Sequence, residues 1–535
     1  MMATPQATQS ETAMINYEVG KVSEEFIRRN RFCRGKRSGK KYRCGNNIDD
    51  SRSINEITEL IIETINRMLK WRIWDDWWIN AWKEEWLKAR SNVELSLRGK
   101  YSDKVINAIL GLINKYIKYI NKLKEYWLRN SINEEIKRLI EDLVSGKAEV
   151  IIRKNNGISI YGGHITLEID KPNENSVTIQ LRLKGLKGMK LKVPNIFRWT
   201  LSKDEYRQFI NELIKALRGG FAITDENIHK GKPAMSTTQI WQVITWSLLY
   251  PGTIYVNISG IKVNENNISI LWFLITNDYN SIKNEVLKVI EEINKEVLPA
   301  FMLTAVLGDG SALIRLKRGK YNEPVIRISM STTKYNAWKQ VLNKLGEIGV
   351  KWDEDPYESW ININFYGSNA IDLAKAMINS LPRILRDILN AFNAEKWTNI
   401  RNMANMKLKF RRGEMQIVVA GFKFTVIAYN GTTKLVLNTK DPNKVKRVLD
   451  ALKREYGEGF IELIHVYEVG KRLSIVIPMY VFERYDDIRI KVIEVLCKKY
   501  EKVDDERRKQ IIIENLKRLI KPTEDVCQRS DSGGK

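Results

Sequence analysis

The chain has 535 residues, 43% of them hydrophobic, so it is long enough for two to four packed units and too apolar to be disordered throughout. Lysine and arginine number 89 against 64 aspartates and glutamates, a formal net charge of +25, so a polyanion is the expected partner: nucleic acid, or alternatively an anionic membrane surface. The sequence contains no apolar run of transmembrane length and its N-terminus lacks a signal-peptide core, which predicts a cytoplasmic protein without a membrane partner.

The metal-binding residue types are few. Four cysteines form no tight C-x-x-C pair and there are only three histidines, which argues against a structural zinc site. Any metal is expected to be held by carboxylate oxygens, as magnesium is.

Residues 1–51 are predicted to be a basic flexible arm. The stretch RRNRFCRGKRSGKKYR, from Arg28 to Arg43, has neither helical nor strand periodicity and is interrupted by two glycines. Clustered arginine with interspersed aromatic residues suits contact with phosphates, where each charge displaces counterions, and a solvated tail is the alternative. The predicted nucleic-acid-binding residues of this arm are Arg28, Arg29, Arg31, Arg34, Lys36, Arg37, Lys40, Lys41 and Arg43.

Residues 52–146 read as helical throughout and contain a tryptophan stripe. Its members recur every three or four residues, so they share one helix face: Trp71, Trp74, Trp78, Trp82 and Trp86. The stripe is either a platform on which bases stack or an aromatic seam of the core. A stripe at helical spacing is far more often core, which we expect here.

Two α+β units are predicted on either side of the segment 299–398. In residues 147–298 the period changes to alternating strands, followed by helix 202–217, a loop over 219–234, helix 236–249, two strands and helix 280–297. Residues 399–521 repeat the mixture of strands and helices, and residues 522–535 form a polar tail.

The segment 299–398 carries the most specific signal. Pro299 opens a short apolar helix that runs into Gly308-Asp309-Gly310 and directly into a strand. The predicted order is α-β-β-α-β-β-α, with further helices over 333–348 and 369–393. An acid held by two glycines therefore lies where a helix ends and a sheet begins.

The stretch MLTAVLGDG, Met302 to Gly310, resembles the motif of the LAGLIDADG homing endonucleases, and the order of elements after it resembles their half-domain. The chain also resembles a multidomain protein family of hyperthermophilic archaea that carries this core. The predicted fold class is accordingly α+β: LAGLIDADG-like αββαββα half-domains with antiparallel sheets, an N-terminal helical segment and a C-terminal α/β unit.

The resemblance implies roles for particular residues. Two motif helices would pack closely, with Ala305 and Gly308 as the small residues between them, and Asp309 would be both the catalytic residue and the ligand of Mg²⁺. Cleavage by two metals needs carboxylates from both halves. A single motif therefore implies a homodimer or a second half within the chain.

A candidate second half lies in residues 147–298. The stretch TWSLLYPGTIYV, Thr245 to Val256, also runs from an apolar helix through a glycine into a strand, but Pro251 stands where Asp309 stands. On this alignment the chain is an internal pseudo-dimer with one acid missing.

The strands after Asp309 predict a DNA-reading surface. One face of the alternating strands is apolar, and the other offers donors and acceptors that suit base edges in a major groove. An ordinary solvated sheet face is the alternative. The predicted nucleic-acid-binding residues here are Ser311, Arg315, Lys317, Arg318, Lys320, Arg327, Ser329, Asn362 and Asn364.

These observations predict a double-stranded DNA-binding protein on a LAGLIDADG-like fold, with cleavage lost or weakened because a single acid is visible. One alternative is an active Mg²⁺-dependent, site-specific endonuclease of a mobile element. The other is a basic structural protein of a nucleoprotein complex.

Overall fold

The computed structural model describes residues 27–34, 43–44, 51–153, 157–173, 176–317, 321–407, 413–469, 472–503 and 505–520. The chain divides into two compact units. One comprises 1–314, 325–364 and 373–404, and the other comprises 405–535 with the segments 315–324 and 365–372. The fold is α+β with antiparallel sheets, as the sequence predicted. No helix among the described residues is long and apolar enough to cross a membrane.

Four helices open the first unit: α3 (Ser51–Trp71), α4 (Trp77–Leu97), α5 (Asp103–Arg129) and α6 (Ile132–Val144). The tryptophan stripe is core, because all five of its members are at most 6% exposed. Trp86 stacks on Tyr116 of α5 at 5.1 Å between ring centroids and meets Trp272 of the adjoining sheet edge-to-face at 5.5 Å. The stripe is therefore the seam between the helical layer and a sheet.

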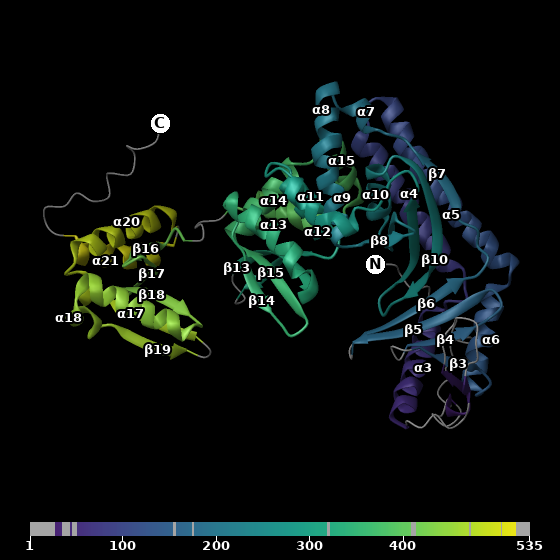
Figure 1. Ribbon diagram of the computed structural model, residues 1–535, viewed down its shortest axis with the longest axis horizontal. Coiled ribbons are helices and arrows are strands. Elements are labelled where there is room, and N and C mark those ends of the chain that lie inside the picture. Colours follow the sequence, from purple (N-terminus) through teal and green to yellow (C-terminus); the bar gives the residue numbers. More distant parts are fainter. Residues whose placement is uncertain are drawn as a thin grey trace. The chain divides into compact units, whose positions relative to one another are not determined.

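That sheet has eleven strands among the described residues, in the order β2-β1-β3-β4-β5-β6-β10-β11-β9-β8, with β7 paired to β10. The strands are β1 (Arg31–Arg34), β2 (Arg43–Cys44), β3 (Glu149–Ile152), β4 (Ile158–Tyr161), β5 (Ile165–Asn173), β6 (Ser176–Leu183), β7 (Met189–Val193), β8 (Glu226–His229), β9 (Lys232–Thr237), β10 (Gly252–Val263) and β11 (Ile268–Thr276). In Figure 1 the helices α4 and α5 run along one side of it.

Part of the predicted flexible arm is a strand of this sheet. Strand β1 pairs in parallel with β3, and Phe32 and Cys33 are buried. Buried Asn30 donates from Nδ2 to the Leu143 carbonyl at 2.8 Å and accepts the Ala148 amide at 2.8 Å. The prediction of a flexible segment was wrong here, because the arginines conceal a short buried strand whose partner lies more than a hundred residues away.

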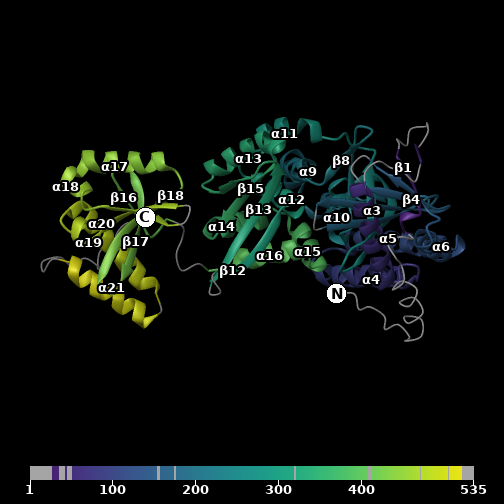
Figure 2. The same ribbon diagram turned by 90° about the horizontal axis from the view of Figure 1, so that it is seen from below.

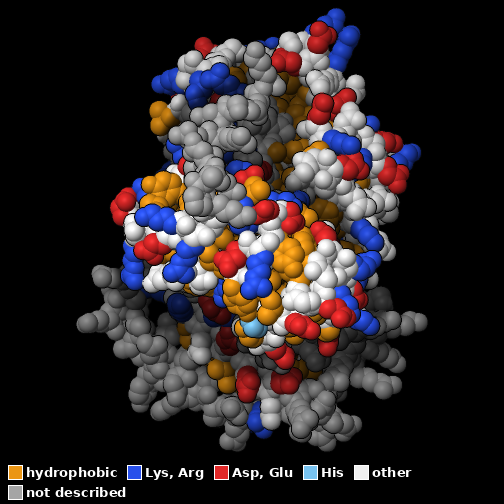
Figure 3. Space-filling view, turned by 90° about the vertical axis from the view of Figure 1, so that its left-hand side faces the viewer, with side chains coloured by type: hydrophobic (Ala, Val, Ile, Leu, Met, Phe, Trp, Pro, Cys, Tyr) orange, Lys and Arg blue, Asp and Glu red, His pale blue; other side chains and the backbone are white. Residues whose placement is uncertain are grey.

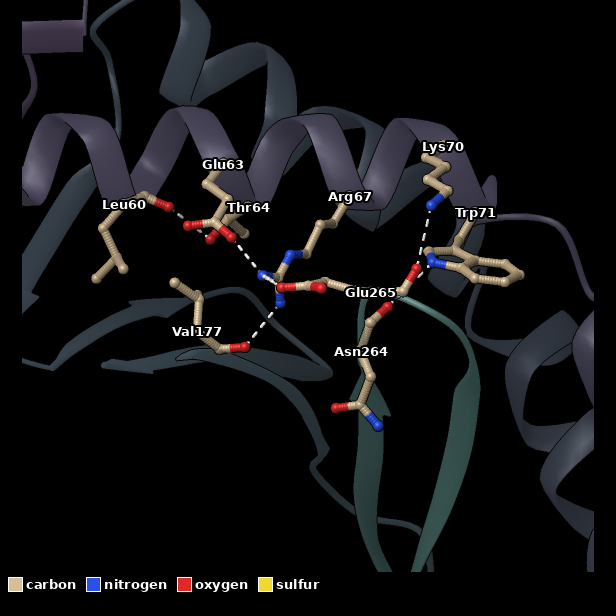
Figure 4. Close-up of polar contacts among 9 residues, drawn as sticks. All are labelled: Leu60, Glu63, Thr64, Arg67, Lys70, Trp71, Val177, Asn264 and Glu265. Atoms are coloured by element: carbon tan, nitrogen blue, oxygen red, sulfur yellow. Dashed lines mark hydrogen bonds and ion pairs between the residues drawn. The ribbon is translucent and has the colours of Figure 1, made fainter. Parts of the chain in front are cut away.

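Helix α3 is held on the sheet by a polar contact (Figure 4). The guanidinium of Arg67 donates to the Val177 carbonyl at 2.7 Å and to Glu265 at 2.9 Å, and it also pairs with Glu63 on its own helix. Trp71 donates from Nε1 to the Asn264 carbonyl at 3.1 Å. The buried cation thus has both carboxylate and carbonyl partners, as burial of a charge requires.

Two successive segments of the chain share one topology. The first repeat is α9 (Ile214–Ile223), β8, β9, α10 (Ile240–Leu249), β10, β11 and α11 (Val286–Glu292). The second is α12 (Leu298–Leu307), β12 (Ser311–Lys317), β13 (Tyr321–Ser331), α13 (Tyr335–Glu347), β14 (Asp353–Pro356), β15 (Trp360–Tyr366) and α14 (Ser368–Asn379). Numbered within each repeat, the strands pair in the same order, first-second-fourth-third: β8-β9-β11-β10 and β12-β13-β15-β14.

Short helices flank the repeats. Helices α7 (Phe197–Thr200) and α8 (Lys203–Gln208) precede α9, and α15 (Arg383–Phe392) and α16 (Glu395–Asn405) follow α14. The predicted long helix over 369–393 is therefore two helices, α14 and α15, with Pro382 as the N-cap of the second. Proline cannot supply the backbone N–H that a continuous helix would need there.

The second unit contains a five-stranded sheet in the order β16-β17-β18-β20-β19. Its strands are β16 (Gln416–Val419), β17 (Phe422–Tyr429), β18 (Thr432–Thr439), β19 (His465–Val469) and β20 (Arg472–Pro478). Its helices are α17 (Pro442–Tyr456), α18 (Glu458–Ile461), α19 (Met479–Phe482), α20 (Asp486–Lys502) and α21 (Glu506–Leu519). The core joins one face of this sheet to α17, α20 and α21.

Candidate active site

Helices α9 and α12 pack so closely that glycine is required between them. A Cβ added at Gly220 would lie 2.2 Å from the Phe301 carbonyl oxygen and 2.1 Å from the Thr304 hydroxyl. One at Gly308 would lie 2.5 Å from the hydroxyl of Thr224. The two helices lie side by side in both ribbon views (Figures 1 and 2). Small residues thus let two backbones approach, and each helix ends directly before an aspartate.

These aspartates are Asp225, after α9, and Asp309, after α12. Their side chains lie close enough for Asp309 to affect the ionisation of Asp225. Burial raises the pKa of Asp225 to about 6, and the neighbouring Asp309 adds to the rise. A like charge nearby disfavours ionisation of Asp225, and a cation bound between the two groups would relieve this repulsion.

The alignment that placed the second motif at Thr245–Val256 was wrong. The helix that packs along α12 is α9, whereas the sequence predicted the helix over 236–249, which is α10. The second acid is therefore present as Asp225, and Pro251 does not replace it. Residues 219–223, predicted as the start of a loop, form the last turn of α9.

The sequence did contain a signal for this helix. LRGGFAITDE, Leu217 to Glu226, places small and apolar residues before an acid, as TAVLGD does at Thr304 to Asp309. Gly219 and Gly220 suggested a helix end because glycine has a low helix propensity. Their role here is to allow close approach of the partner helix, which propensity alone does not reveal.

Neighbouring side chains position Asp225. Gln242 of α10 donates from Nε2 to its carboxylate, and the Thr237 hydroxyl donates to the Gln242 carbonyl oxygen. This chain fixes the orientation of the amide and leaves its NH₂ group aimed at Asp225. Asp309, in contrast, is exposed to solvent.

Two lysines lie beside the acids. Lys396 of α16 donates from Nζ to the Leu307 carbonyl at 3.1 Å and also to the Gly308 carbonyl, so it caps the end of α12. Lys283 donates to the backbone carbonyl of Glu226. Burial lowers the pKa of both lysines, while Asp225 and Asp309 oppose that fall. The two ammonium groups concentrate positive charge next to the acid pair.

A second carboxyl is buried behind the pair. Glu226 is fully buried and accepts hydrogen bonds from the Tyr250 hydroxyl at 2.7 Å and from Trp246 Nε1 at 3.3 Å. Burial raises the pKa of Glu226 to about 7. Its side chain points into the packed interior of the first repeat and holds the base of β8 beneath Asp225.

The donor set of Asp225 and Asp309 fits a divalent cation such as Mg²⁺. Two neighbouring carboxylates supply the oxygen ligands that such a cation prefers. No group of three or more histidine, cysteine, aspartate or glutamate side chains in the described part of the chain could hold a metal. The remaining ligands would therefore be backbone carbonyls, water or phosphate oxygens of a substrate.

The sheet of the first repeat offers a basic groove of ≈ 480 Å³. Phe273 and Ile275 of β11 line it, while the alternate residues Trp272 and Leu274 are buried on the opposite face, toward the helices. Polar groups around the groove are His229, Lys230, Lys232, Asn257 and Asn277. Lys190 and Lys192 of β7 pair with Tyr255 and Thr253 of β10 on the same side. None of these residues was among those predicted from the sequence.

The sheet of the second repeat brings several predicted residues together on one face. Arg327 donates from Nε to the Asn364 amide oxygen at 2.7 Å, and Ser329 donates to the Asn362 amide oxygen at 2.6 Å. Asn364 is fully buried and also donates to Asp355 at 3.0 Å. The prediction that Asn364 is free to read bases is therefore corrected: its amide is already engaged.

The remaining predicted residues lie in several different surroundings. Ser311 is half-buried at the start of β12. Arg315 pairs with Glu323 at 2.7 Å and lies over the ring of Tyr366. Among the arm residues, Arg28, Arg29 and Arg31 are exposed. The following lie outside the described residues, wholly or in their side chains: Lys317, Arg318, Lys320, Arg34, Lys36, Arg37, Lys40, Lys41 and Arg43.

The chain is similar to solved structures of LAGLIDADG homing endonucleases. The meganuclease I-SmaMI bound to uncleaveable DNA matches at 10% identity over 37% of this chain and 99% of that chain, with a TM-score of 0.22. I-GzeII in complex with its DNA target matches at 13% identity over 42% and 97%, with a TM-score of 0.13. At such scores the matches carry no weight for function, which is inferred below from the chain's own residues.

No protein-family model and no curated protein sequence matches the chain. The likeness to a protein family of hyperthermophilic archaea therefore stays a prediction.

Proposed function

We propose that this chain binds double-stranded DNA across the sheets of its two repeats and hydrolyses phosphodiester bonds at the acid pair, with Mg²⁺. The observation that carries the proposal is the meeting of Asp225 and Asp309 at the ends of two close-packed helices, each leading into a sheet of the same strand order. Cleavage was expected to be lost because Asp309 was the only acid visible in the sequence. With Asp225 beside it, this reason no longer applies.

The internal pair also favours a pseudo-dimer over a homodimer. Both carboxylates come from one chain, so a second copy is not needed to complete the metal ligands. The basic groove of the first repeat and the Arg327 face of the second would hold the duplex on either side of the acids.

Each residue has a distinct part in this proposal. Asp225 and Asp309 would hold the divalent cation, and Gln242 would orient Asp225. When bound, the cation would supply Lewis acidity to the phosphoryl group and to the attacking water. Lys283 and Lys396 would offset the phosphate charge near the acids, because both ammonium groups are close enough for the acids to raise their pKa values.

The test is a cleavage-and-binding selection on random duplex DNA with the full chain, with and without Mg²⁺ or Mn²⁺. Asp225→Asn and Asp309→Asn should each reduce cleavage by about 10³-fold or more, because the loss of a metal ligand removes several kcal/mol of transition-state stabilisation. Both variants should still bind duplex DNA. Asp204→Asn, at an exposed site on α8, is the matched control and should cleave normally.

Two outcomes would contradict the proposal. If the unaltered chain selects a duplex sequence but never cuts it with either metal, the protein is a DNA-binding protein without cleavage. If duplex affinity barely changes with salt concentration, phosphate contacts are not the basis of binding at all.

A further inference from the structure

The C-terminal sheet has the strand order of the two repeats. Its elements run β17, β18, α17, β19, β20, α20, and the strands pair in the order β17-β18-β20-β19. What differs is the element in front. Strand β17 is preceded by its hairpin partner β16, where each repeat has a helix that ends at an aspartate. This third sheet therefore lacks a counterpart of Asp225 and Asp309.

One face of this sheet packs against helices, and the other is exposed at its margins but not at its centre, where Val436 and Val476 are each 7% exposed. The helices α17, α20 and α21 pack on Phe424, Leu435 and Ile475 and their neighbours in register. The opposite face, here called the open face, carries a row that crosses all five strands: Gln416, Thr425, Val436, Val476 and His465. No member of that row belongs to the core that joins the helices to the sheet.

Aromatic rings lie on the open face and at its margin. Tyr467, two residues after His465 on the edge strand β19, is 50% exposed, and its ring stacks on that of His465 at 5.8 Å with an interplanar angle of 28°. Tyr480 also approaches this pair, with its hydroxyl 3.4 Å from His465 Nε2. On the same face but farther from β19, Lys434 lies over the ring of Tyr429 at 4.7 Å. Leaving so many rings in water is costly unless something stacks on them.

The charges of the open face have one sign. Lys423, Lys434 and Arg472 belong to this face by strand alternation, and no aspartate or glutamate does among the described residues of the five strands. Glu468 of β19 is paired with Leu473, which places it on the other face. The open face therefore attracts a polyanion. In Figure 3 a histidine reaches the surface among hydrophobic side chains, and both basic and acidic side chains surround them.

We propose that the open face of the C-terminal unit binds single-stranded nucleic acid. Cations spaced among exposed rings suit a strand whose phosphates meet the lysines while its unpaired bases stack on Tyr467 and its neighbours. A duplex hides the faces of its bases and could use only the charges. This inference is independent of cleavage, because the open face has no acid pair and lies outside the proposed active site.

The test measures the anisotropy of a labelled oligothymidine and oligouridine with the full chain, and of a labelled mixed-sequence duplex. Tyr467→Ala should weaken single-strand affinity about 5- to 150-fold, the range expected for losing one stacked base. Lys423→Glu should weaken it as well and reduce its salt dependence. Duplex affinity should change little in both variants.

Matched controls lie on the helical side of the same unit. Tyr500→Ala on α20 and Lys446→Glu on α17 alter exposed residues away from the open face and should leave single-strand affinity unchanged. The double variant Lys230→Glu, Lys232→Glu, in the groove of the first repeat, should lower duplex affinity without changing single-strand affinity. If this double variant bound duplex DNA as tightly as the unaltered chain, the result would count against the proposed function and not against this inference.

Three outcomes would overturn the inference. Equal single-strand affinities for Tyr467→Ala and Tyr500→Ala would exclude stacking on the open face. A loss of duplex affinity with unchanged single-strand affinity would make the face a duplex reader. If Tyr467→Ala or Lys423→Glu converted a dimer into a monomer in sedimentation, with unchanged single-strand affinity, the open face would be an interface between two copies of the chain.

Discussion

The two repeats have the same strand order but opposite surroundings. The sheet of the first repeat continues on one edge into β6 and β7, and the tryptophan-rich helices cover its back. The sheet of the second has four strands, and its Trp360 stacks on Tyr357 at the surface, 48% exposed. The same strand order therefore occurs once as part of an eleven-stranded sheet backed by tryptophans and once as a separate four-stranded sheet.

Their polar faces differ in the same way. The first repeat presents lysines around a groove. The second presents Arg327 and Asn364 already bonded to each other, and Asp355 beside them. The comparison teaches that topology sets where a ligand-binding face lies, while the individual side chains decide how much charge it offers. The acids are unequal too, since Asp225 is held by Gln242 and Asp309 is exposed.

The largest expected effect concerns the tryptophans of the two sheets. Trp272→Ala should destabilise the protein by about 3–5 kcal/mol, because the fully buried ring touches Trp86 and Tyr116 and its loss leaves a cavity. Trp360→Ala should change the unfolding free energy by about 0.5 kcal/mol or less, as at most exposed sites. Urea denaturation of both variants measures the difference, and similar losses would show that the two sheets depend equally on buried aromatics.

The contact between the repeats should be the next most sensitive. Gly220→Ala should cost about 1–3 kcal/mol, because its Cβ would collide with α12 and the backbones would have to separate. Gly111→Ala in α5 is the control. Its Cβ would meet nothing within 4 Å, so it should instead stabilise by roughly 1 kcal/mol through helix propensity. Thermal unfolding distinguishes the two, and a neutral Gly220→Ala would mean that α9 and α12 are not in close contact.

The inequality of the two acids can be tested through Gln242. Gln242→Ala removes the amide that orients Asp225, and loss of such an outer partner typically lowers metal affinity by about 10- to 100-fold. Calorimetric titration with Mn²⁺ measures this in the full chain. Gln208→Ala, at an exposed position of α8, should leave the affinity unchanged. An unchanged affinity in Gln242→Ala would show that Asp225 needs no support.

The smallest effect should separate the two polar faces. Lys230→Ala in the first repeat should reduce the slope of duplex affinity against salt by about 0.9, the value for one phosphate contact. Arg315→Ala should change that slope less, because Glu323 already neutralises its charge. Titrations at several salt concentrations compare them, and a larger effect of Arg315 would mean that the second repeat makes the main phosphate contacts.

Local sequence patterns were enough to predict most of the secondary structure and Asp309, one of the two acids of the candidate site. The apolar helix before Gly308-Asp309-Gly310 and the α-β-β-α-β-β-α order could be read directly, because each element has its own hydrophobic period. The five tryptophans were correctly expected to be core, but they lie on two helices and the turn between them, not on one helix face. Strand β1 was not predicted, because a four-residue segment rich in arginine is too short to show a strand periodicity.

By itself, the sequence determined the basic charge, the α+β class and Asp309 as an acid at a helix end. Only the tertiary structure decided which helix packs against α12, and hence that Asp225 is the second acid. The physical reason is that the contact depends on space: Gly219 and Gly220 weaken a helix locally, but Gly220 admits a partner helix at a distance that any side chain would block. The stabilisation from this close packing arises only when α9 and α12 are in contact, so it cannot be predicted from the local sequence.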